Sequence, residues 1–320
     1  MPSFRLLASA AGFLATALIA MPALAYPVTV KSCNRDVTFE AAPKRAISND
    51  VNLTEMMLAL QLQDRMVGYT GISAWKTLDQ KLRDGVKELP ELSEKYPTKE
   101  VLLNADADFL FAGWNYGMKV GGEVTPETLA PFKINVYELT ESCIHIMAKA
   151  KPTMSDMFVD ILNLGAIFGV DDKAKTLVAG YEKGLADIKN RIGEVKQPVR
   201  VFVYDSGTEK PFTSGRFGIP TAMIEAAGGV NIMDDVDKNW VEVSWEPVIE
   251  RNPQVIVIVN YGDVTAEQKI AFMKENPAFK NLDAFRSDRF AVLDYVEATP
   301  GPRNIDAISR LADTFHPRSM

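Results

Sequence analysis

A long amphipathic helix is the feature that most constrains how this chain can fold. In residues 171–195 apolar side chains recur every three or four positions, the spacing of one face of an α-helix. Asp171 and Asp172 open the segment, and the next proline is Pro198. At 1.5 Å per residue the helix would be roughly 35 Å long, about the width of a small domain. It is either an ordinary surface helix or a strut between two domains, and similar sequence on both sides of it favours the strut.

The first 25 residues predict export. A single charge, Arg5, precedes an apolar run over residues 6–20, and the segment ends in Ala23-Leu24-Ala25. This is the pattern of a secretory signal peptide, residues 1–25, cleaved after Ala25; the alternative is an uncleaved membrane anchor. Because no cysteine follows the cleavage site and no other apolar run is long enough to span a membrane, we expect a periplasmic protein without a lipid anchor or stable membrane insertion.

The charge of the chain limits the partners to expect, and its length limits the number of domains. It has 35 basic and 42 acidic side chains, a formal net charge of −7 that becomes one unit more negative when Arg5 leaves with the signal peptide. An acidic balance without a basic stripe argues against nucleic acid as a partner. The remaining length is sufficient for two domains with a core each.

Cysteine and histidine are scarce. Cys33 and Cys143 are the only cysteines, and in an oxidising compartment we expect them to form a disulfide. Closing so long a loop is worth roughly 4–5 kcal/mol on the chain-entropy model. A metal site needs several ligands, and the chain has only His145 and His316, so we expect no histidine-based metal site and no cofactor.

Strand and helix patterns alternate along the chain. Before the long helix the expected strands include residues 43–48 and 65–69, with a helix between them. The helix is predicted to begin at Asn52 as N-cap, with Glu55 completing a capping box. Such alternation predicts parallel βαβ packing, with ligands at the carboxyl ends of the strands.

Two stretches of the sequence resemble each other at a constant offset of 146 residues. Residues 98–103 match residues 244–249, and in both a Ser or Thr N-cap is followed two positions later by a glutamate, Glu100 or Glu246. Weak similarity of this kind also arises by chance. Each glutamate is favoured by the helix dipole, which is a sufficient structural reason for it. The two together would also form a matched acidic pair suited to a two-fold partner with two basic sites.

Four strings carry a family resemblance. Residues 243–253, VSWEPVIERNP, resemble the second-lobe segment of class III periplasmic binding proteins of ABC transporters. Residues 42–48, 54–60 and 64–68 resemble the first-lobe opening of the same family, and the similarity extends over nearly all of the exported chain. Members of that family serve ferric siderophores and vitamin B12.

The resemblance implies an α/β fold of two Rossmann-like lobes, residues 26–170 and 196–320, joined by the single helix at residues 171–195, with the ligand cleft between the lobes. It also implies a monomer that docks onto an ABC permease dimer with its ATPase subunits. In this docking Glu100 and Glu246 would bind arginines on the two permease subunits. The sequence departs from the family pattern where a Pro-Asp pair is usual. Ala107-Asp108 and Pro253-Gln254 stand there instead.

The ligand-contacting loops match no single subfamily, so cleft candidates come from position, mostly after strands. Aromatic faces with one or two arginines suit a flat or anionic metal chelate. The candidate ligand-binding residues are Asn49, Asp50, Trp114, Asn115, Tyr116, Tyr204, Ser206, Arg216, Trp240, Tyr261 and Arg303.

Ferric siderophore, cobamide and haem remain as ligands, in that order, and haem is disfavoured because no axial histidine is evident. The rival class is a secreted hydrolase. In that reading Asp205-Ser206-Gly207 would be a nucleophile turn recruiting His145 or His316, but the chain has no Gly-x-Ser-x-Gly elbow and no phosphate-binding glycine motif. We therefore expect a binding protein and not an enzyme.

Overall fold

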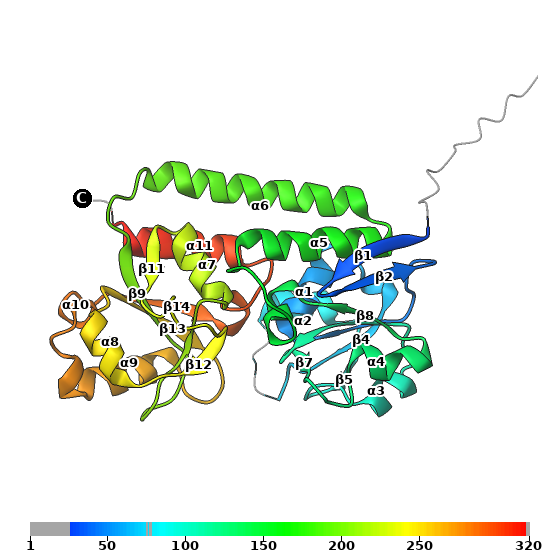
Figure 1. The fold of residues 1–320 in the computed structure, drawn as a ribbon, viewed down its shortest axis with the longest axis horizontal. Coiled ribbons are helices and arrows are strands. Elements are labelled where there is room, and N and C mark those ends of the chain that lie inside the picture. Colours follow the sequence, from blue (N-terminus) through cyan, green and yellow to red (C-terminus); the bar gives the residue numbers. More distant parts are fainter. Residues whose placement is uncertain (1–25, 75, 77–78, 318–320) are drawn as a thin grey trace, which may run out of the picture.

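A computed structural model describes residues 26–74, 76 and 79–317, so the predicted signal peptide, residues 1–25, lies outside the described residues. Two α/β lobes stand side by side, and one long helix, α6 (Asp171–Ile192), lies across both of them (Figure 1). The predicted fold class is confirmed, because each lobe is built on a parallel sheet with helices around it. Within the described residues no helix is long and apolar enough to cross a membrane.

The sheet of the N-terminal lobe has the strand order β5-β4-β3-β6, with β7 and β8 both paired to β6. Every residue of β6 is buried, which explains why its sequence is continuously apolar instead of alternating. An antiparallel hairpin, β1–β2, precedes the sheet. The strands are β1 (Val28–Ser32), β2 (Arg35–Phe39), β3 (Ala46–Asn49), β4 (Met66–Thr70), β5 (Glu91–Ser93), β6 (Phe109–Trp114), β7 (Gly117–Met118) and β8 (Asn135–Glu138). The helices are α1 (Val51–Ala59), η1 (Gln63–Arg65), α2 (Gln80–Val86), α3 (Lys99–Asn104), α4 (Pro126–Leu129), η2 (Ala130–Phe132), η3 (Thr140–His145) and α5 (Met154–Phe168), where η marks a 3₁₀-helix.

The sheet of the C-terminal lobe is parallel, with the strand order β11-β9-β13-β14. A small antiparallel pair, β10–β12, lies apart from it. The strands are β9 (Val199–Tyr204), β10 (Phe212–Ser214), β11 (Gly229–Asn231), β12 (Trp240–Glu242), β13 (Val255–Asn260) and β14 (Phe290–Asp294). The helices are α7 (Ile219–Ala226), α8 (Trp245–Arg251), α9 (Ala266–Glu275), η4 (Pro277–Phe279), α10 (Asp283–Arg286), η5 (Tyr295–Glu297) and α11 (Asn304–Phe315).

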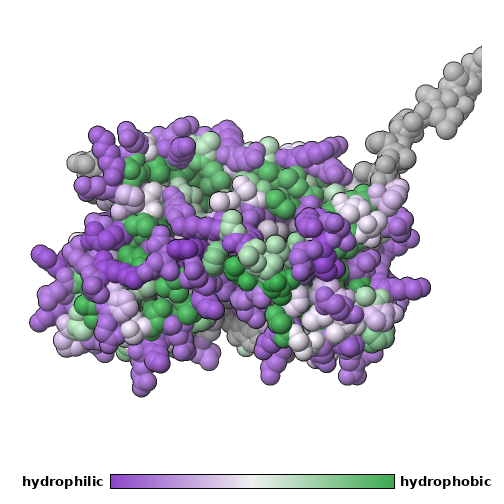
Figure 2. Space-filling view, in the orientation of Figure 1, coloured by the Kyte–Doolittle hydropathy of each residue, from purple (hydrophilic) through white to green (hydrophobic). Residues whose placement is uncertain are grey.

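Helix α6 packs on one helix of each lobe. Towards the N-terminal lobe its Tyr181 ring stacks on Phe158 of α5, with ring centroids 6.1 Å apart. Towards the C-terminal lobe, a Cβ added at Gly184 would come within 2.6 Å of Ile305 of α11, so the glycine permits close approach of the two helices. Hydrophilic side chains follow the outer edge of α6 (Figure 2). The helix therefore packs on both lobes. The amphipathic pattern predicted the helix, and the similar sequence on both sides of it favoured a strut.

Two predicted helix boundaries were wrong. Helix α6 ends at Ile192 and not at residue 195, because Gly193 adopts a positive φ of 67° that breaks the helical path. Helix α1 has Asp50, and not Asn52, as its N-cap, and the Asp50 carboxylate accepts from the Val51 amide. The Asn52 side chain instead donates to the carbonyl of Pro300 in the other lobe.

Equivalent contacts in the two lobes support the internal similarity. In the N-terminal lobe the Asp108 carboxylate accepts from the backbone amide of Arg45, just before the first sheet strand, at 2.9 Å. In the C-terminal lobe the side-chain oxygen of Gln254 accepts from the amide of Arg200 at 3.1 Å. Gln254 thus reproduces the contact that Asp108 makes, which explains why the departure from Pro-Asp leaves this part of the fold intact.

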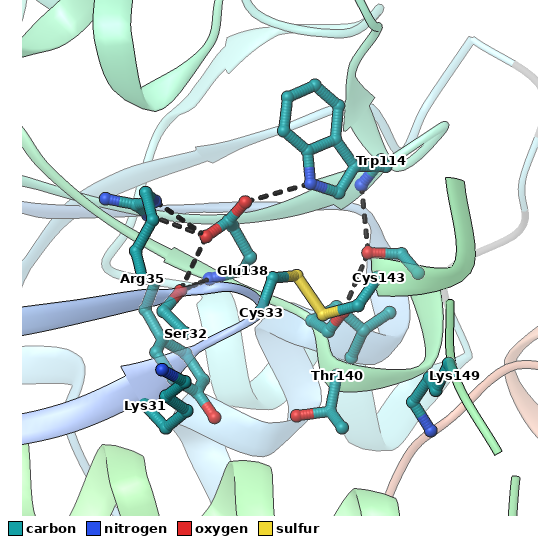
Figure 3. The surroundings of a disulfide bond; sticks show 12 residues. Lys31, Ser32, Cys33, Arg35, Trp114, Glu138, Thr140, Cys143 and Lys149 are labelled. Carbon is teal, nitrogen blue, oxygen red and sulfur yellow. Dashed lines mark hydrogen bonds and ion pairs between the residues drawn. A yellow bond between two sulfur atoms is a disulfide. The ribbon is translucent and has the colours of Figure 1, made fainter. Parts of the chain in front are cut away.

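The predicted disulfide is present. Cys33 in the turn of the β1–β2 hairpin is bonded to Cys143 in η3, across 110 residues of sequence (Figure 3). Beside it the Glu138 carboxylate accepts hydrogen bonds from Ser32 and Arg35 of the hairpin and from the indole of Trp114 (Figure 3). The disulfide and this buried carboxylate together attach the hairpin to the end of β6 and to η3.

Candidate functional site

A cavity of about 250 Å³ lies between the two lobes. Three of its lining residues come from the N-terminal lobe and the rest from the C-terminal lobe. They are Asn115, Tyr116 and His145, and Asp205, Phe212, Asn239, Trp240, Val259, Tyr261, Tyr295, Ala298 and Thr299. Most follow strands of the two parallel sheets, as expected for a site at the carboxyl ends of strands.

Aromatic rings form much of the wall. Phe212 and Trp240, paired across β10 and β12, are stacked at 5.8 Å with an interplanar angle of 21°. Tyr261 and Tyr295 follow neighbouring strands, β13 and β14, and meet edge to face at 5.5 Å. Tyr116 belongs to the other lobe and lines the same cavity as Trp240. The arrangement offers flat apolar faces from both lobes.

Each of the two edge-to-face tyrosines is held by a buried carboxylate and backed by a lysine. The Tyr261 hydroxyl donates to Asp205 at 2.7 Å, and the Lys269 ammonium lies 4.9 Å from the centre of the Tyr261 ring. Lys269 itself donates to the carbonyls of Asp205 and Val259, both at 2.6 Å. Burial raises the pKa of Tyr261, and the neighbouring Asp205 raises it further. The phenol therefore stays neutral.

The second tyrosine repeats this arrangement across the cleft. The Tyr295 hydroxyl donates to Asp50 of the other lobe at 3.0 Å. The Asp50 carboxylate is also 2.6 Å from the Lys76 ammonium, which lies 4.8 Å from the centre of the Tyr295 ring. Burial and the Asp50 charge raise the pKa of Tyr295 well above its ordinary value. Asp50 has a positive φ of 73° and therefore sits in a backbone conformation that is costly for a non-glycine residue.

A histidine bridges the lobes at the cavity wall. His145 Nε2 lies 3.2 Å from the side-chain nitrogen of Asn115 in its own lobe and 3.1 Å from that of Asn239 in the other. Burial, followed by the positive charge of Lys238, lowers the pKa of His145. The imidazole is therefore neutral at neutral pH.

Four of the residues predicted from the sequence line the cavity. They are Asn115, Tyr116, Trp240 and Tyr261. Four more do not line the cavity themselves. Asp50 holds Tyr295, Ser206 donates to Asp205 at 2.7 Å, Asn49 accepts from Thr70 at 2.9 Å, and Tyr204 packs on Trp245 in the C-terminal lobe.

The other three predicted residues are not brought to this cavity. The Trp114 indole turns away and donates to Glu138 at 2.9 Å. Arg216 is paired with Asp237 at 2.8 Å. Arg303 bridges the lobes elsewhere, donating to Glu55 of α1 at 2.9 Å and to Asp79. Both arginines are thus bound to carboxylates of this chain, and among the described lining residues of the cavity there is no arginine or lysine.

Sequence reasoning missed several residues of the wall. Phe212 is the first residue of the short strand β10 and Asn239 directly precedes its partner β12, and no sequence signal marks either residue. Tyr295 directly follows β14, and the rule that cleft residues follow strands would have found it had that strand been predicted. His145 ends the 3₁₀-helix that follows β8, so the same rule reaches it less directly.

The two glutamates predicted for docking occupy matched positions. Glu100 is the second residue of α3 and Glu246 the second residue of α8, and both are exposed. Hydrogen bonds from Ser244 and from its own amide lower the pKa of Glu246. The two helices lie in different lobes, both away from α6 (Figure 1).

The residues of the rival catalytic reading are not assembled. Ser206 donates to Asp205, whereas His145 is occupied by Asn115 and Asn239. The His316 side chain contacts the carbonyl of Ala227, at the far end of α7. Among the described residues no group of three or more His, Cys, Asp or Glu side chains could hold a metal ion.

Two α/β lobes with an aromatic cavity between them define a solute-binding protein of the two-lobed type. The family model described as periplasmic binding protein matches residues 48–296, and the chain belongs to that family. The resemblance to class III binding proteins of ABC transporters is confirmed. Such proteins bind a solute and act with permease and ATPase components of a transporter, and they are not enzymes.

Three proteins are similar to this chain over more than two thirds of its length. A crystal structure of a periplasmic binding protein from Veillonella parvula is 31% identical with a TM-score of 0.80, over 92% of this chain and 98% of that one. An uncharacterised ABC transporter substrate-binding lipoprotein, YvrC of Bacillus subtilis, is 24% identical over 91% of this chain and 86% of its own length. A vitamin B12-binding protein of Pectobacterium atrosepticum is 25% identical over 71% of this chain and 75% of its own.

Proposed function

We propose that this protein is the periplasmic receptor of an ABC importer and that its ligand is a metal chelate. The observation that carries the proposal is the cavity between the lobes, whose wall is aromatic on both sides. Flat aromatic faces bind large, partly apolar ligands by stacking, and a few placed polar groups fix their orientation. Export by a signal peptide cleaved after Ala25, and a monomeric state, complete the proposal.

The charges around the cavity limit the net charge of the chelate that it can bind. The expectation of an anionic ligand depended on Arg216 and Arg303, and both are paired with carboxylates outside the cavity. The wall therefore supports a neutral or weakly charged chelate better than a highly anionic one. Ferric siderophores of the neutral hydroxamate type and cobamides meet this condition, whereas haem carries two propionate carboxylates and does not. The relative named as a vitamin B12-binding protein supports a cobamide.

The size of the cavity indicates that the lobes separate for loading. About 250 Å³ lies below the range of roughly 300–1,000 Å³ usual for small-molecule sites, and these chelates are large ligands. Helix α6 spans both lobes and resists bending, so we expect the opening to be a rocking motion of a few degrees.

Docking is proposed to use Glu100 and Glu246, each binding an arginine on one permease subunit. Replacing both by Ala should leave the fold and ligand affinity nearly unchanged, because each is exposed. Transporter-coupled uptake should fall sharply, since each acid would lose a charge-assisted contact worth about 1.5–3 kcal/mol. The matched control replaces the exposed Glu123 and Glu209, which lie outside the paired helix starts, by Ala. Wild-type uptake by the Glu100/Glu246 variant would rule out this docking pair.

The function is tested on protein purified from its own periplasm. Native mass spectrometry should find a metal-containing small molecule bound to the chain lacking residues 1–25, and the absorbance spectrum should show a visible band that disappears on unfolding. A ligand without metal, or a chain that retains the signal segment, would contradict the corresponding part of the proposal.

A further inference from the structure

We propose that the surface that meets the permease has a second, apolar part in each lobe, formed by Leu103 of α3 and Ile249 of α8. The inference rests on the proposed function, because it supposes that Glu100 and Glu246 dock onto a permease dimer. It adds the chemistry of the partner, since each permease subunit would carry an apolar pocket beside the arginine that receives the glutamate.

The two apolar side chains occupy the same place in the two lobes. Leu103 is the fifth residue of α3 and Ile249 the fifth residue of α8, and they are 146 positions apart, as the two glutamates are. Helix α3 leads into β6, which lies between β3 and β8, and α8 leads into β13, which lies between β9 and β14. The equivalence is therefore one of fold as well as of sequence.

Both side chains are exposed to solvent. Along residues 98–104 and 244–250 the exposed, half-buried and buried positions follow each other in the same order. Leu103 is 39% exposed and Ile249 is 36% exposed. Because residues three apart on a helix are neighbours on one face, each of them lies beside the glutamate of its own helix. Each lobe thus presents one acidic and one apolar side chain together.

Few large apolar side chains in the described part of the chain are this exposed. Besides Leu103 and Ile249 they are Val120, Phe132, Met147, Val159, Leu162, Val264 and Val292. No other two of these residues are 146 positions apart. A single exposed leucine or valine needs no explanation, whereas two at equivalent positions, each next to a proposed docking acid, form a repeated feature.

A matching contact holds each helix in place. In the N-terminal lobe the ammonium of Lys99, the residue before the docking acid, lies 5.9 Å from the centre of the Phe132 ring in η2. In the C-terminal lobe Trp245, also the residue before the docking acid, packs on Phe279 in η4 with ring centroids 4.6 Å apart. Each helix is thus held against a short 3₁₀-helix, so the two exposed pairs keep a defined orientation.

These features define the chemistry of the partner. Helices α3 and α8 lie in different lobes, both on the side of the molecule away from α6 (Figure 1). A partner that covers both must offer the same site twice, as a two-fold dimer does. The acid is complementary to an arginine, and the apolar side chain gains from burial only against an apolar surface. A permease dimer, the component with which proteins of this family act, is such a partner.

The contact is first identified by photocrosslinking in cells that produce the full exported protein. Leu103, Ile249 and, as a control, Leu162 are replaced one at a time by p-benzoylphenylalanine. Leu162 of α5 is 37% exposed and therefore similarly accessible, but it lies outside α3 and α8. Mass spectrometry of the products should find peptides of one ABC permease at the first two positions and none at Leu162.

The affinity for that permease–ATPase complex, held in lipid nanodiscs, is then measured with three double variants. Leu103→Gln with Ile249→Gln removes the apolar groups and keeps both glutamates. Glu100→Ala with Glu246→Ala removes the acids. Val159→Gln with Leu162→Gln, on α5, is the matched control. Because Gln has nearly the helix propensity of Leu, circular dichroism and thermal unfolding should match the wild type.

We expect Leu103→Gln with Ile249→Gln to bind the complex roughly 10- to 50-fold more weakly than the wild type, about 3- to 7-fold for each side chain. Each side chain still exposes more than a third of its surface, which is the part that docking would bury. The two single variants should lose affinity to a similar extent, because the sites are equivalent. The α5 control should bind like the wild type.

Each contrary outcome overturns a definite part of the reasoning. Unchanged affinity of the Gln pair on α3 and α8, with weak binding of the glutamate variant, would overturn the apolar contact and leave the docking acids in place. Loss in only one of the two single variants would overturn the two-fold equivalence. Unchanged affinity of both double variants would overturn this inference and the docking pair together.

Other occupants of the surface are distinguished by the same proteins. Binding of the wild type, but not of the Gln pair, to empty vesicles of phosphatidylethanolamine and phosphatidylglycerol would assign the surface to lipid. A wild-type dimer that the Gln pair abolishes would assign it to a second copy of the chain. Absence of a permease from the crosslinked products would overturn the inference, while a metal chelate found in the periplasmic protein would still support the proposed ligand.

Discussion

A buried carboxyl at the seam between the lobes should make the fold less stable as the pH rises. Glu141 in η3 is 1% exposed, and within the described structure neither of its oxygens makes a hydrogen bond. Burial raises the pKa of Glu141 to about 8, while the Ile219 amide at the start of α7, across the seam, and Lys149 lower it in smaller measure. Asp156 and Asp160 act in the opposite direction.

The sign and size of the effect follow from proton linkage. Above pH 4.5, the ordinary value for this carboxyl, the unfolded chain releases the proton, whereas the folded chain keeps it up to about pH 8. The folded state binds more protons in this window, so stability is present in full below about pH 4.5 and is lost as the pH rises. At about 1.36 kcal/mol per unit, the free energy of unfolding should fall by about 3 kcal/mol between pH 4.5 and 7.5 through Glu141 alone.

The substitution Glu141→Gln removes the titration while keeping the shape of the side chain. The free energy of unfolding of both proteins, without ligand, is measured by urea denaturation at pH 4.5, 6 and 7.5. Asp160, whose pKa burial raises to about 7, is present in both proteins. We expect the Gln variant to gain about 3 kcal/mol relative to the wild type across this range. Glu123→Gln, at an exposed position, should show no such gain. Parallel pH profiles for wild type and Glu141→Gln would refute the reasoning.

Three further predictions concern the disulfide of the N-terminal lobe, an ion pair between the lobes and the motion of the lobes on ligand binding. Reducing the Cys33–Cys143 bond, which spans 110 residues, should lower the free energy of unfolding by roughly 4–5 kcal/mol in chemical denaturation, and two free thiols in freshly exported protein would contradict the bond. Arg303→Met should destabilise by about 3–5 kcal/mol because it leaves the buried Glu55 carboxylate unpaired, and adding Glu55→Gln should recover part of that loss; additive effects in this double-mutant cycle would disprove the coupling. Small-angle scattering curves of free and loaded protein should nearly superimpose, and a large contraction on loading would show that α6 does not limit the motion.

What the sequence predicted well was set by local patterns. The apolar spacing of α6, the alternation of strand and helix, and the glutamates two positions after a Ser or Thr N-cap in α3 and α8 each depend on residues within one or two turns of each other. The disulfide needed only the compartment and the presence of two cysteines. Such features can be predicted because the residues that interact are close together in the sequence or, like the two cysteines, have a single possible partner.

What the sequence did not predict depends on partners far along the chain. Asn52 and Glu55 had the spacing of a capping box, but their side chains contact Pro300 and Arg303, both 248 positions away. Arg216 was assigned to the ligand because an arginine near aromatic residues suits an anion, whereas its partner, Asp237, is a carboxylate of the same chain. Nothing in the spacing of charged residues tells which opposite charge will satisfy them once the lobes meet.

The helix η3 shows how these distant parts act together. A 3₁₀-helix has three residues per turn, so Glu141, Cys143 and His145, at every second position, project in three directions about 120° apart. One direction faces the start of α7 in the other lobe, one is bonded to the N-terminal hairpin, and one faces the cavity. The disulfide therefore holds in place the segment that presents the imidazole, although Cys33 is far from the ligand. Because His145 lines the cavity, reduction of the disulfide should weaken ligand affinity as well as stability, and a reduced protein with unchanged affinity would show that η3 is held by its other contacts alone.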